Sequence, residues 1–176
     1  MTAGQYAPPM DRDTLRATQA PLKDQYRAEP TSALVTLHAQ GSLGDDVTCS
    51  VQTGRAMVEA GLHPATGGDG RSVCSGDMLL QALVACAGVT MASVATSLGL
   101  EVTGTLRAEG DLDFRGTLAV DKQTPVGFTA IRLVADLESD AGQDELDTLL
   151  RLTERYCVVF QTLANPPTLS ASYAGG

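Results

Sequence analysis

Cysteine side chains are the residues of this sequence whose type and position could support chemistry. There are four, Cys49, Cys74, Cys86 and Cys157, and none belongs to a CxxC pair or to a Cys/His cluster with zinc spacing. A thiolate is the nucleophile in thiol chemistry, so a reactive cysteine needs a lowered pKa and therefore a nearby cation or hydrogen-bond donors. Cys86 and Cys157 are the main candidates, because each lies on or beside a predicted helix.

Cys86 lies in the middle of the clearest predicted element, an apolar helix over residues 77–98. One face of this helix follows a 4-3-4-3 spacing, formed by Leu79, Leu83, Cys86, Thr90 and Ser93. A helix that is apolar all round should be buried on most sides. A buried free cysteine usually behaves as a small hydrophobic residue, so inert packing is the alternative to reactivity here.

Cys157 follows a predicted amphipathic helix over residues 143–155 and stands two residues after Arg155. An ordinary half-buried thiol is the alternative interpretation at this position. Cations that could lower the pKa of Cys86 are Arg71, in the glycine-rich loop before the helix over 77–98, and Arg27 or Arg55. Asp77 could orient such an arginine through a bidentate contact or could cap the helix.

Two sequence segments resemble the OsmC/Ohr family. The segment GDMLLQALVACAGVTM is similar to the first-cysteine motif on the family's central helix, and TERYCVVFQTL is similar to its second-cysteine motif. The two cysteines occur in the family's order, 71 positions apart. The resemblance extends over roughly residues 30–173.

The resemblance implies an intertwined homodimer, with antiparallel sheets wrapped around two central helices, that reduces organic hydroperoxides without a cofactor. Cys86 matches the peroxidatic cysteine, which is oxidised to a sulfenic acid, and Cys157 matches the resolving cysteine. The resulting disulfide would be reopened by a dithiol reductant. We therefore expect Cys86, Cys157, Asp77 and Arg71 to form the catalytic site.

The sequence departs from the family pattern at three places. One branch of the family carries Glu at the position of Gly76, and other branches carry an acidic residue at the position of Asp77. The loop GSLGDD contains no arginine, so no residue matches the family's catalytic arginine by motif. Val158 stands where many members have proline. Cys74 is also a possible spare resolving thiol, and the role of Cys49 stays open.

The remaining pattern predicts an α+β fold. A short helix over 11–20 should stop at Pro21, within a partly helical extension over residues 1–30, and one domain follows over 31–176. Alternation predicts strands, and a turn is expected over 41–46. A second helical segment is predicted over 158–164. The predicted strands are 32–40, 47–53, 56–62, 101–109, 112–120, 128–138 and 168–173.

Charge and composition restrict the partners of the chain. Among 176 residues the net charge is −9 and aromatic residues make up 4%, which argues against nucleic acid. The N-terminus lacks a secretory signal, which favours a cytoplasmic location and reduced thiols. No transmembrane helix is predicted on the criterion of an uncharged apolar stretch of about 18 residues, so no membrane partner is expected.

Three hypotheses about function follow. The first is a hydroperoxide reductase that uses Cys86 and Cys157. The second is a non-enzymatic relative that binds a small hydrophobic ligand or senses an oxidant. The third, a metal-binding protein, has weaker support, because His38 and His63 show no ligand spacing and are interpreted as a strand and a turn histidine.

Overall fold

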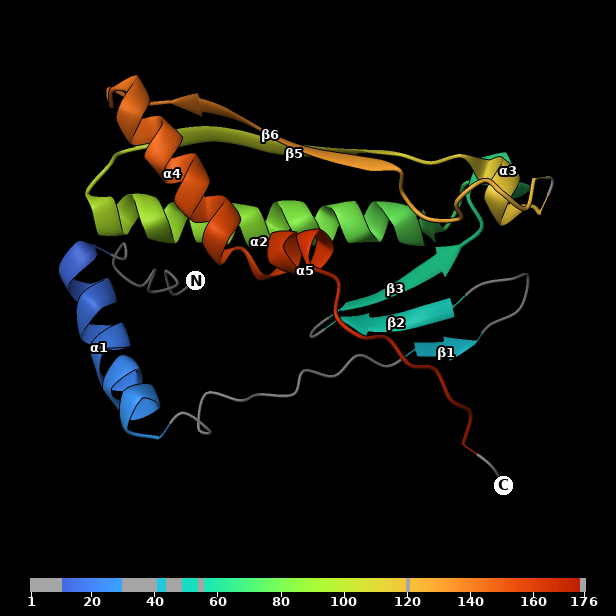
Figure 1. Cartoon of the computed structure of the whole chain (residues 1–176), viewed down its shortest axis with the longest axis horizontal. Helices are drawn as coiled ribbons and strands as arrows, with labels where there is room; N and C mark the ends of the chain where they lie inside the picture. Colours follow the sequence, from blue (N-terminus) through green and yellow to red (C-terminus); the bar gives the residue numbers. More distant parts are fainter. Residues whose placement is uncertain (1–10, 30–40, 44–48, 54–55, 120, 175–176) are drawn as a thin grey trace, which may run out of the picture.

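The computed structural model describes residues 11–29, 41–43, 49–53, 56–119 and 121–174 of the chain. The strand predicted over residues 32–40, which includes His38, lies outside the described residues. The described part mixes helices with two antiparallel-rich sheets, which confirms the predicted α+β class (Figure 1).

The central element is helix α2, Ser75–Leu98, as predicted. Its sequence is rich in leucine and alanine, both strong helix formers. It begins after Cys74, whose side chain makes no capping hydrogen bond, rather than through a cap by Ser75 or Asp77. It ends at Gly99, whose φ of 74° is left-handed and whose N–H donates to the carbonyls of Ala95 and Thr96.

Strands β5, Thr103–Asp111, and β6, Ala130–Glu138, form a two-stranded antiparallel sheet along α2 (Figure 1). Alternation turns one face of each strand toward the helix. Leu106 and Ala108 from β5, with Ile131 and Leu133 from β6, pack around the buried residues of α2. This sheet covers one side of the core helix.

Helix α4, Gln143–Tyr156, and helix α5, Val158–Ala164, lie against α2 as two successive segments, as predicted. The side chain of Glu145 accepts a hydrogen bond from the N–H of Gly142 at 3.0 Å, which fixes the start of α4. Leu149 of α4 is fully buried and packs with Met91 and Ala95 of α2. The predicted apolar stripe of α4 is therefore the face that contacts α2.

A second sheet contains four strands in the order β1-β2-β3-β4. The strands are β1 Gly41–Leu43, β2 Cys49–Thr53, β3 Ala56–Gly61 and β4 Val73–Cys74. β1, β2 and β3 pair antiparallel, whereas β4 is parallel to β3 and leads directly into α2. Figure 1 shows β1–β3 on the other side of α2 from β5 and β6.

Four predictions about secondary structure are wrong. Helix α1 covers Arg12–Ala28 and continues through Pro21. Residues 112–120 contain the short helix α3, Phe114–Thr117, because Asp113 caps its start by accepting the N–H of Arg115. Residues 168–173 form no strand, and Gly41–Leu43 is a strand rather than part of a turn.

Helix α2 is buried less completely than its composition suggests. Leu83, Ala87, Met91 and Ala95 are buried, whereas Val89 is 74% exposed. By length and composition α2 could cross a membrane, so the prediction that no segment meets this criterion is wrong. Its packing against β5, α4 and α5 is that of the core helix of a globular domain.

We expect Leu149→Ala to lower the free energy of unfolding by about 3 kcal/mol, because it empties a fully buried site between α4 and α2. Leu150→Ala is the matched control. Its side chain is 39% exposed, so its loss should stay below about 1 kcal/mol. Urea denaturation followed by circular dichroism measures both variants. Equal losses would contradict the packing of α4 on α2.

Candidate thiol site

Cys157 lies at the junction between α4 and α5, where it ends one helix and begins the next. Its N–H donates to the carbonyl of Thr153 at 2.9 Å, and its carbonyl accepts the N–H of Gln161 at 2.9 Å. The side chain of Gln161 also donates to the carbonyl of Glu154 at 2.8 Å, across the junction. The backbone on both sides therefore holds the Cys157 side chain in one place.

The junction packs onto the face of α2 that carries Cys86. Cys157 is 1% exposed and shares a buried cluster with Leu83 and Ala87, and Cys86 packs against this cluster as a half-buried residue. The two cysteines, 71 positions apart in sequence, meet at this cluster, and each affects the pKa of the other. Both are free thiols.

The environment moves the pKa values of the two thiols in opposite directions. Burial alone would raise the pKa of Cys86, but hydrogen bonds to the sulfur outweigh this effect and hold the pKa below its ordinary value. The donors are the N–H of Val159, the Cys157 thiol, the N–H of Val158 and the Thr90 hydroxyl. No charged side chain contributes to this lowering among the described residues.

Burial raises the pKa of Cys157, although the N–H of Phe160 donates to its Sγ at 3.5 Å and acts in the opposite sense. The neighbouring Cys86 raises it further, because a thiolate on Cys86 is stabilised by a proton that stays on Cys157. The pair therefore favours an anionic Cys86 beside a protonated Cys157. In this arrangement Cys86 can act as a nucleophile while Cys157 remains a protonated thiol.

Asp77 and Arg71 lie apart from this pair. Asp77 is exposed in the first turn of α2, nine residues before Cys86, which is about 13 Å along a helix axis. The side chain of Arg71 is 89% exposed, and its Nε lies 3.4 Å from Asp69. The side chains of Arg27 and Arg55 lie outside the described part of the chain. The assignment of a cation to Cys86 stays a prediction.

The other candidates from the sequence have simple surroundings. Cys74 precedes Cys86 by twelve residues, about 18 Å of helix, whereas a disulfide needs Cα atoms within about 7 Å. Cys49 lies on β2, opposite Ala60 of β3. The Nδ1 of His63 accepts the N–H of Ala65 at 3.0 Å, which confirms a turn histidine. No group of three or more potential ligands could hold a metal ion within the described residues.

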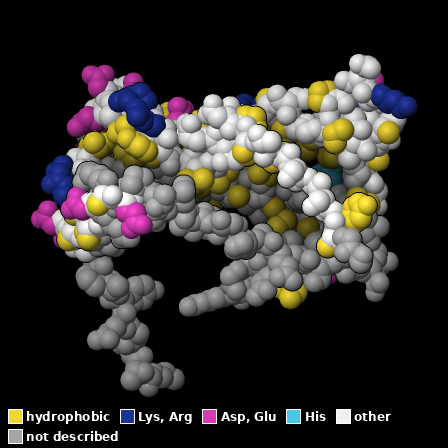
Figure 2. Space-filling view, turned by 60° about the horizontal axis from the view of Figure 1, so that its bottom comes forward, with side chains coloured by type: hydrophobic (Ala, Val, Ile, Leu, Met, Phe, Trp, Pro, Cys, Tyr) yellow, Lys and Arg dark blue, Asp and Glu magenta, His cyan; other side chains and the backbone are white. Residues whose placement is uncertain are grey.

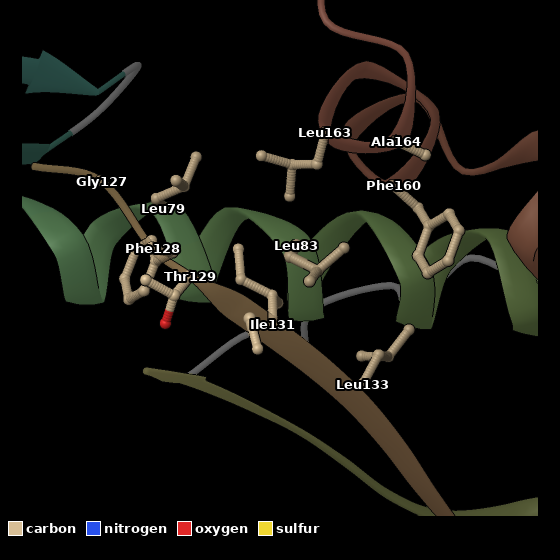
Figure 3. Close-up of a pocket in the computed structure, with 11 residues that line it drawn as sticks. Leu79, Leu83, Gly127, Phe128, Thr129, Ile131, Leu133, Phe160, Leu163 and Ala164 are labelled. Atoms are coloured by element: carbon tan, nitrogen blue, oxygen red, sulfur yellow. The ribbon is translucent and has the colours of Figure 1, made fainter. Parts of the chain in front are cut away.

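An apolar cavity of about 510 Å³ lies next to the buried cluster of Leu83, Ala87 and Cys157, and Leu83 lines it. Helix α2, the start of β6 and α5 border this cavity, which opens to solvent, and none of its lining side chains is charged (Figure 3). Leu83 belongs to this cluster. Four other residues that line the cavity pack against the cluster: Ile131, Leu133, Phe160 and Leu163. On the surface, hydrophobic side chains gather in the hollowed middle of one face (Figure 2).

Sequence reasoning did not identify this cavity or the donors to Cys86. The alternation of β6 places Ile131 and Leu133 on one face, but only the packing of α5 shows that they meet Phe160 and Leu163. Backbone N–H groups carry no residue-type signal, so Val158 and Val159 could not be recognised as donors from the sequence.

Comparison with known proteins agrees with this architecture. Residues 68–172 match the family model described as OsmC-like protein. A structure of an OsmC-like protein from Mycoplasma pneumoniae is 14% identical, with a TM-score of 0.64, and the match covers 75% of this chain and 89% of that one. No curated protein matches the chain.

Two organic hydroperoxide resistance proteins also share the fold. The one from Legionella pneumophila is 18% identical, with a TM-score of 0.55, and the match covers 76% of this chain and 92% of that one. The one from Elizabethkingia anophelis is 14% identical, with a TM-score of 0.55, and the match covers 76% and 91%. These likenesses confirm the predicted fold.

We expect Thr90→Val to shift the alkylation of Cys86 to higher pH. The change removes a hydroxyl that lowers the pKa of Cys86, so less thiolate should be present at neutral pH. Thr96→Val is the matched control, because the Thr96 hydroxyl donates to the Ala92 carbonyl on the same helix. Mass spectrometry of iodoacetamide-treated protein across pH measures the rate at Cys86. Identical profiles for Thr90→Val and the parent would contradict the assigned donor.

Proposed function

This chain belongs to the OsmC-like protein family, and on that premise we propose that it reduces organic hydroperoxides with Cys86 and Cys157. Family membership and neighbours with hydroperoxide resistance in their names indicate a redox role related to peroxide. The observation that carries the finer proposal is the contact between the two thiols, in which Cys86 has a lowered pKa and Cys157 a raised one.

The first chemical step is attack by the Cys86 thiolate on the outer oxygen of a hydroperoxide. A sulfur–oxygen bond forms, the O–O bond breaks, and the alkoxide leaves and takes a proton from water to become an alcohol. Cys86 is oxidised to a sulfenic acid and the peroxide is reduced. The N–H groups of Val158 and Val159 and the Thr90 hydroxyl stabilise the thiolate before attack.

The second step uses Cys157. Its sulfur attacks the Cys86 sulfenic acid, a disulfide forms, and the hydroxyl leaves as water with the thiol proton. The position of Cys157 at a helix junction suits this role, because a short segment rather than a whole helix must adjust as the sulfurs bond. A dithiol reductant then exchanges with the disulfide and restores both thiols.

The cavity beside the cysteine cluster supports an apolar organic hydroperoxide as substrate. Burial of each methylene group contributes about 0.8 kcal/mol, and no charged side chain lines the cavity. The roles of Asp77 and Arg71 in the site remain part of this proposal. In this proposal the cation near Cys86 is either Arg71, after its loop has moved, or a basic side chain from elsewhere in the homodimer.

Among the described residues no charged side chain donates to Cys86, which favours a second, non-enzymatic function. In that alternative the cavity binds a small hydrophobic molecule, or the thiol pair senses an oxidant, without repeated turnover. Hydrogen bonds stabilise a thiolate less than a full positive charge does. Slow or single oxidation would then be sufficient for the function.

The proposal also includes a cytoplasmic homodimer. A reducing compartment would keep both thiols ready for peroxide. Apolar side chains on α2 remain exposed in the single chain, with Val89 at 74%, Leu98 at 40% and Leu79 at 37%. A second copy that packs on α2 would bury them and would complete the two-helix core expected for the family.

We expect Cys86→Ser to abolish peroxide consumption, because Cys86 is the thiol whose pKa is lowered, whereas burial raises the pKa of its neighbour Cys157. Cys157→Ser should consume one equivalent and leave a sulfenic acid that dimedone traps. Cys74→Ser is the control and should behave like the parent protein. The assay follows cumene hydroperoxide loss, with dithiothreitol to measure turnover and without reductant for the one-equivalent limit of Cys157→Ser. Peptide mapping of the oxidised, reductant-free parent protein tests for a Cys86–Cys157 disulfide. Turnover by Cys86→Ser at the parent rate would refute the proposal.

We expect the parent protein to sediment at twice its chain mass, and Val89→Asp to sediment at the mass of one chain. The substitution would place a carboxylate in an apolar contact, where an unpaired charge is costly. Analytical ultracentrifugation measures both masses. A parent protein that stays monomeric at high concentration would contradict the homodimer.

A further inference from the structure

The Phe128 ring fits into a space formed by two glycines. A Cβ atom at Gly110, near the end of β5, would lie only 2.5 Å from Cε1 of this ring. A Cβ atom at Gly76, in the first turn of α2, would lie 3.3 Å from its Cζ. A side chain at either glycine would force the ring to move. The ring therefore occupies space that is free only because residues 76 and 110 are glycines.

Phe128 separates two cavities. The first is the cavity of about 510 Å³ beside the cysteine cluster, and the second, of about 390 Å³, lies beneath α3 and the start of α2. Phe128, Leu79 and Gly127 line both. Figure 3 shows Phe128 and Leu79 at one end of the first cavity, with Phe160 and Leu133 at the other.

The two ends of the first cavity differ in their neighbours. Phe160 and Leu133 pack against the cluster that contains Cys157, whereas Phe128 and Leu79 do not, so the end with Phe160 lies nearer the thiol pair. Phe128 stands at the remote end, in front of a second apolar space lined by residues such as Leu62, Leu112 and Phe114. An alkyl chain that extends along the cavity from the end with Phe160 therefore meets the Phe128 ring.

We propose that Phe128 is a specificity-determining residue that sets the longest straight, uncharged alkyl chain the site accepts. No Asp, Glu, Lys or Arg side chain lines either cavity, and the Nδ1 of His63 in the second cavity accepts the Ala65 N–H. The proposal rests on the proposed function for its substrate class. The position of Phe128 and the separation of the two cavities do not depend on it.

The sharpest test uses binding of straight-chain alcohols, which are the products expected from alkyl hydroperoxides and do not oxidise thiols. Calorimetry with butanol, octanol, dodecanol and intermediate alcohols measures affinity against chain length in the reduced full-length protein. Each buried methylene should raise affinity about fourfold, equivalent to about 0.8 kcal/mol. In the parent protein this gain should stop at the length where the chain reaches Phe128.

Phe128→Ala should join the two cavities, so the gain should continue to longer chains and raise the affinity for the longest alcohol at least tenfold. Phe128→Leu is a milder variant that should move the limit in the same direction if the alanine variant fails to fold. Leu163→Ala is the control, because Leu163 lines only the first cavity. It should change the affinities without moving the chain length at which the gain stops.

An unchanged limit in both folded Phe128 variants would overturn the proposal, as would an equal shift in Leu163→Ala. The parallel assay compares turnover of butyl and dodecyl hydroperoxide. A shifted alcohol limit without turnover of either peroxide would refute the reductase function and leave the Phe128 limit standing. Turnover of both peroxides with no shift in the limit would refute the role of Phe128 alone.

Discussion

Ala87 is fully buried where Cys157 packs against α2, and a larger side chain there would push the helix junction away. This close approach brings the first turn of α5 to the part of α2 that carries Cys86. The N–H groups of Val158 and Val159 are unpaired within α5 by the geometry of any helix start, so they are free to stabilise the sulfur. The burial of Cys157, its position beside Cys86 and the N–H donors to Cys86 therefore all depend on the contact between α2 and the helix junction.

The same contact explains why the two thiols differ. Both are removed from water, which raises the pKa of any thiol. Cys86 receives several donors and becomes the favoured anion, whereas Cys157 provides one of those donors and keeps its proton. The two pKa values differ because Cys86 accepts hydrogen bonds from the start of α5 and from Cys157, whereas Cys157 donates one to Cys86. No charged side chain in the described part of the chain contributes to this difference.

The apolar surroundings of the site complement the acidic character of the whole chain. A net charge of −9 disfavours the approach of anions, and a cavity without charged lining favours neutral organic molecules. The charged side chains of β5 and β6 face outward instead. Arg132 pairs with Asp111, and Arg107 with Asp136 at 2.6 Å, on the exposed side of the sheet. Strand alternation thus separates a charged surface from an apolar interior.

Hydrophobic periodicity was sufficient to predict α2, α4, β2, β5 and β6, because these segments carry a clear period of 3.6 or 2. It failed at Pro21, at residues 112–120 and at 168–173. A short cap by Asp113 overrides weak alternation in the second case, and strand formation in the third requires a partner as well as a pattern.

The sequence by itself determined the two cysteines, their order and the helices that carry them, since residue types and local periods are properties of the chain. Tertiary structure decided that the thiols meet, which backbone N–H groups face Cys86, and that Phe128 fills the space left by Gly76 and Gly110. These features depend on the distances between segments far apart in sequence. Such distances are set by how closely buried surfaces pack, and no local pattern encodes them.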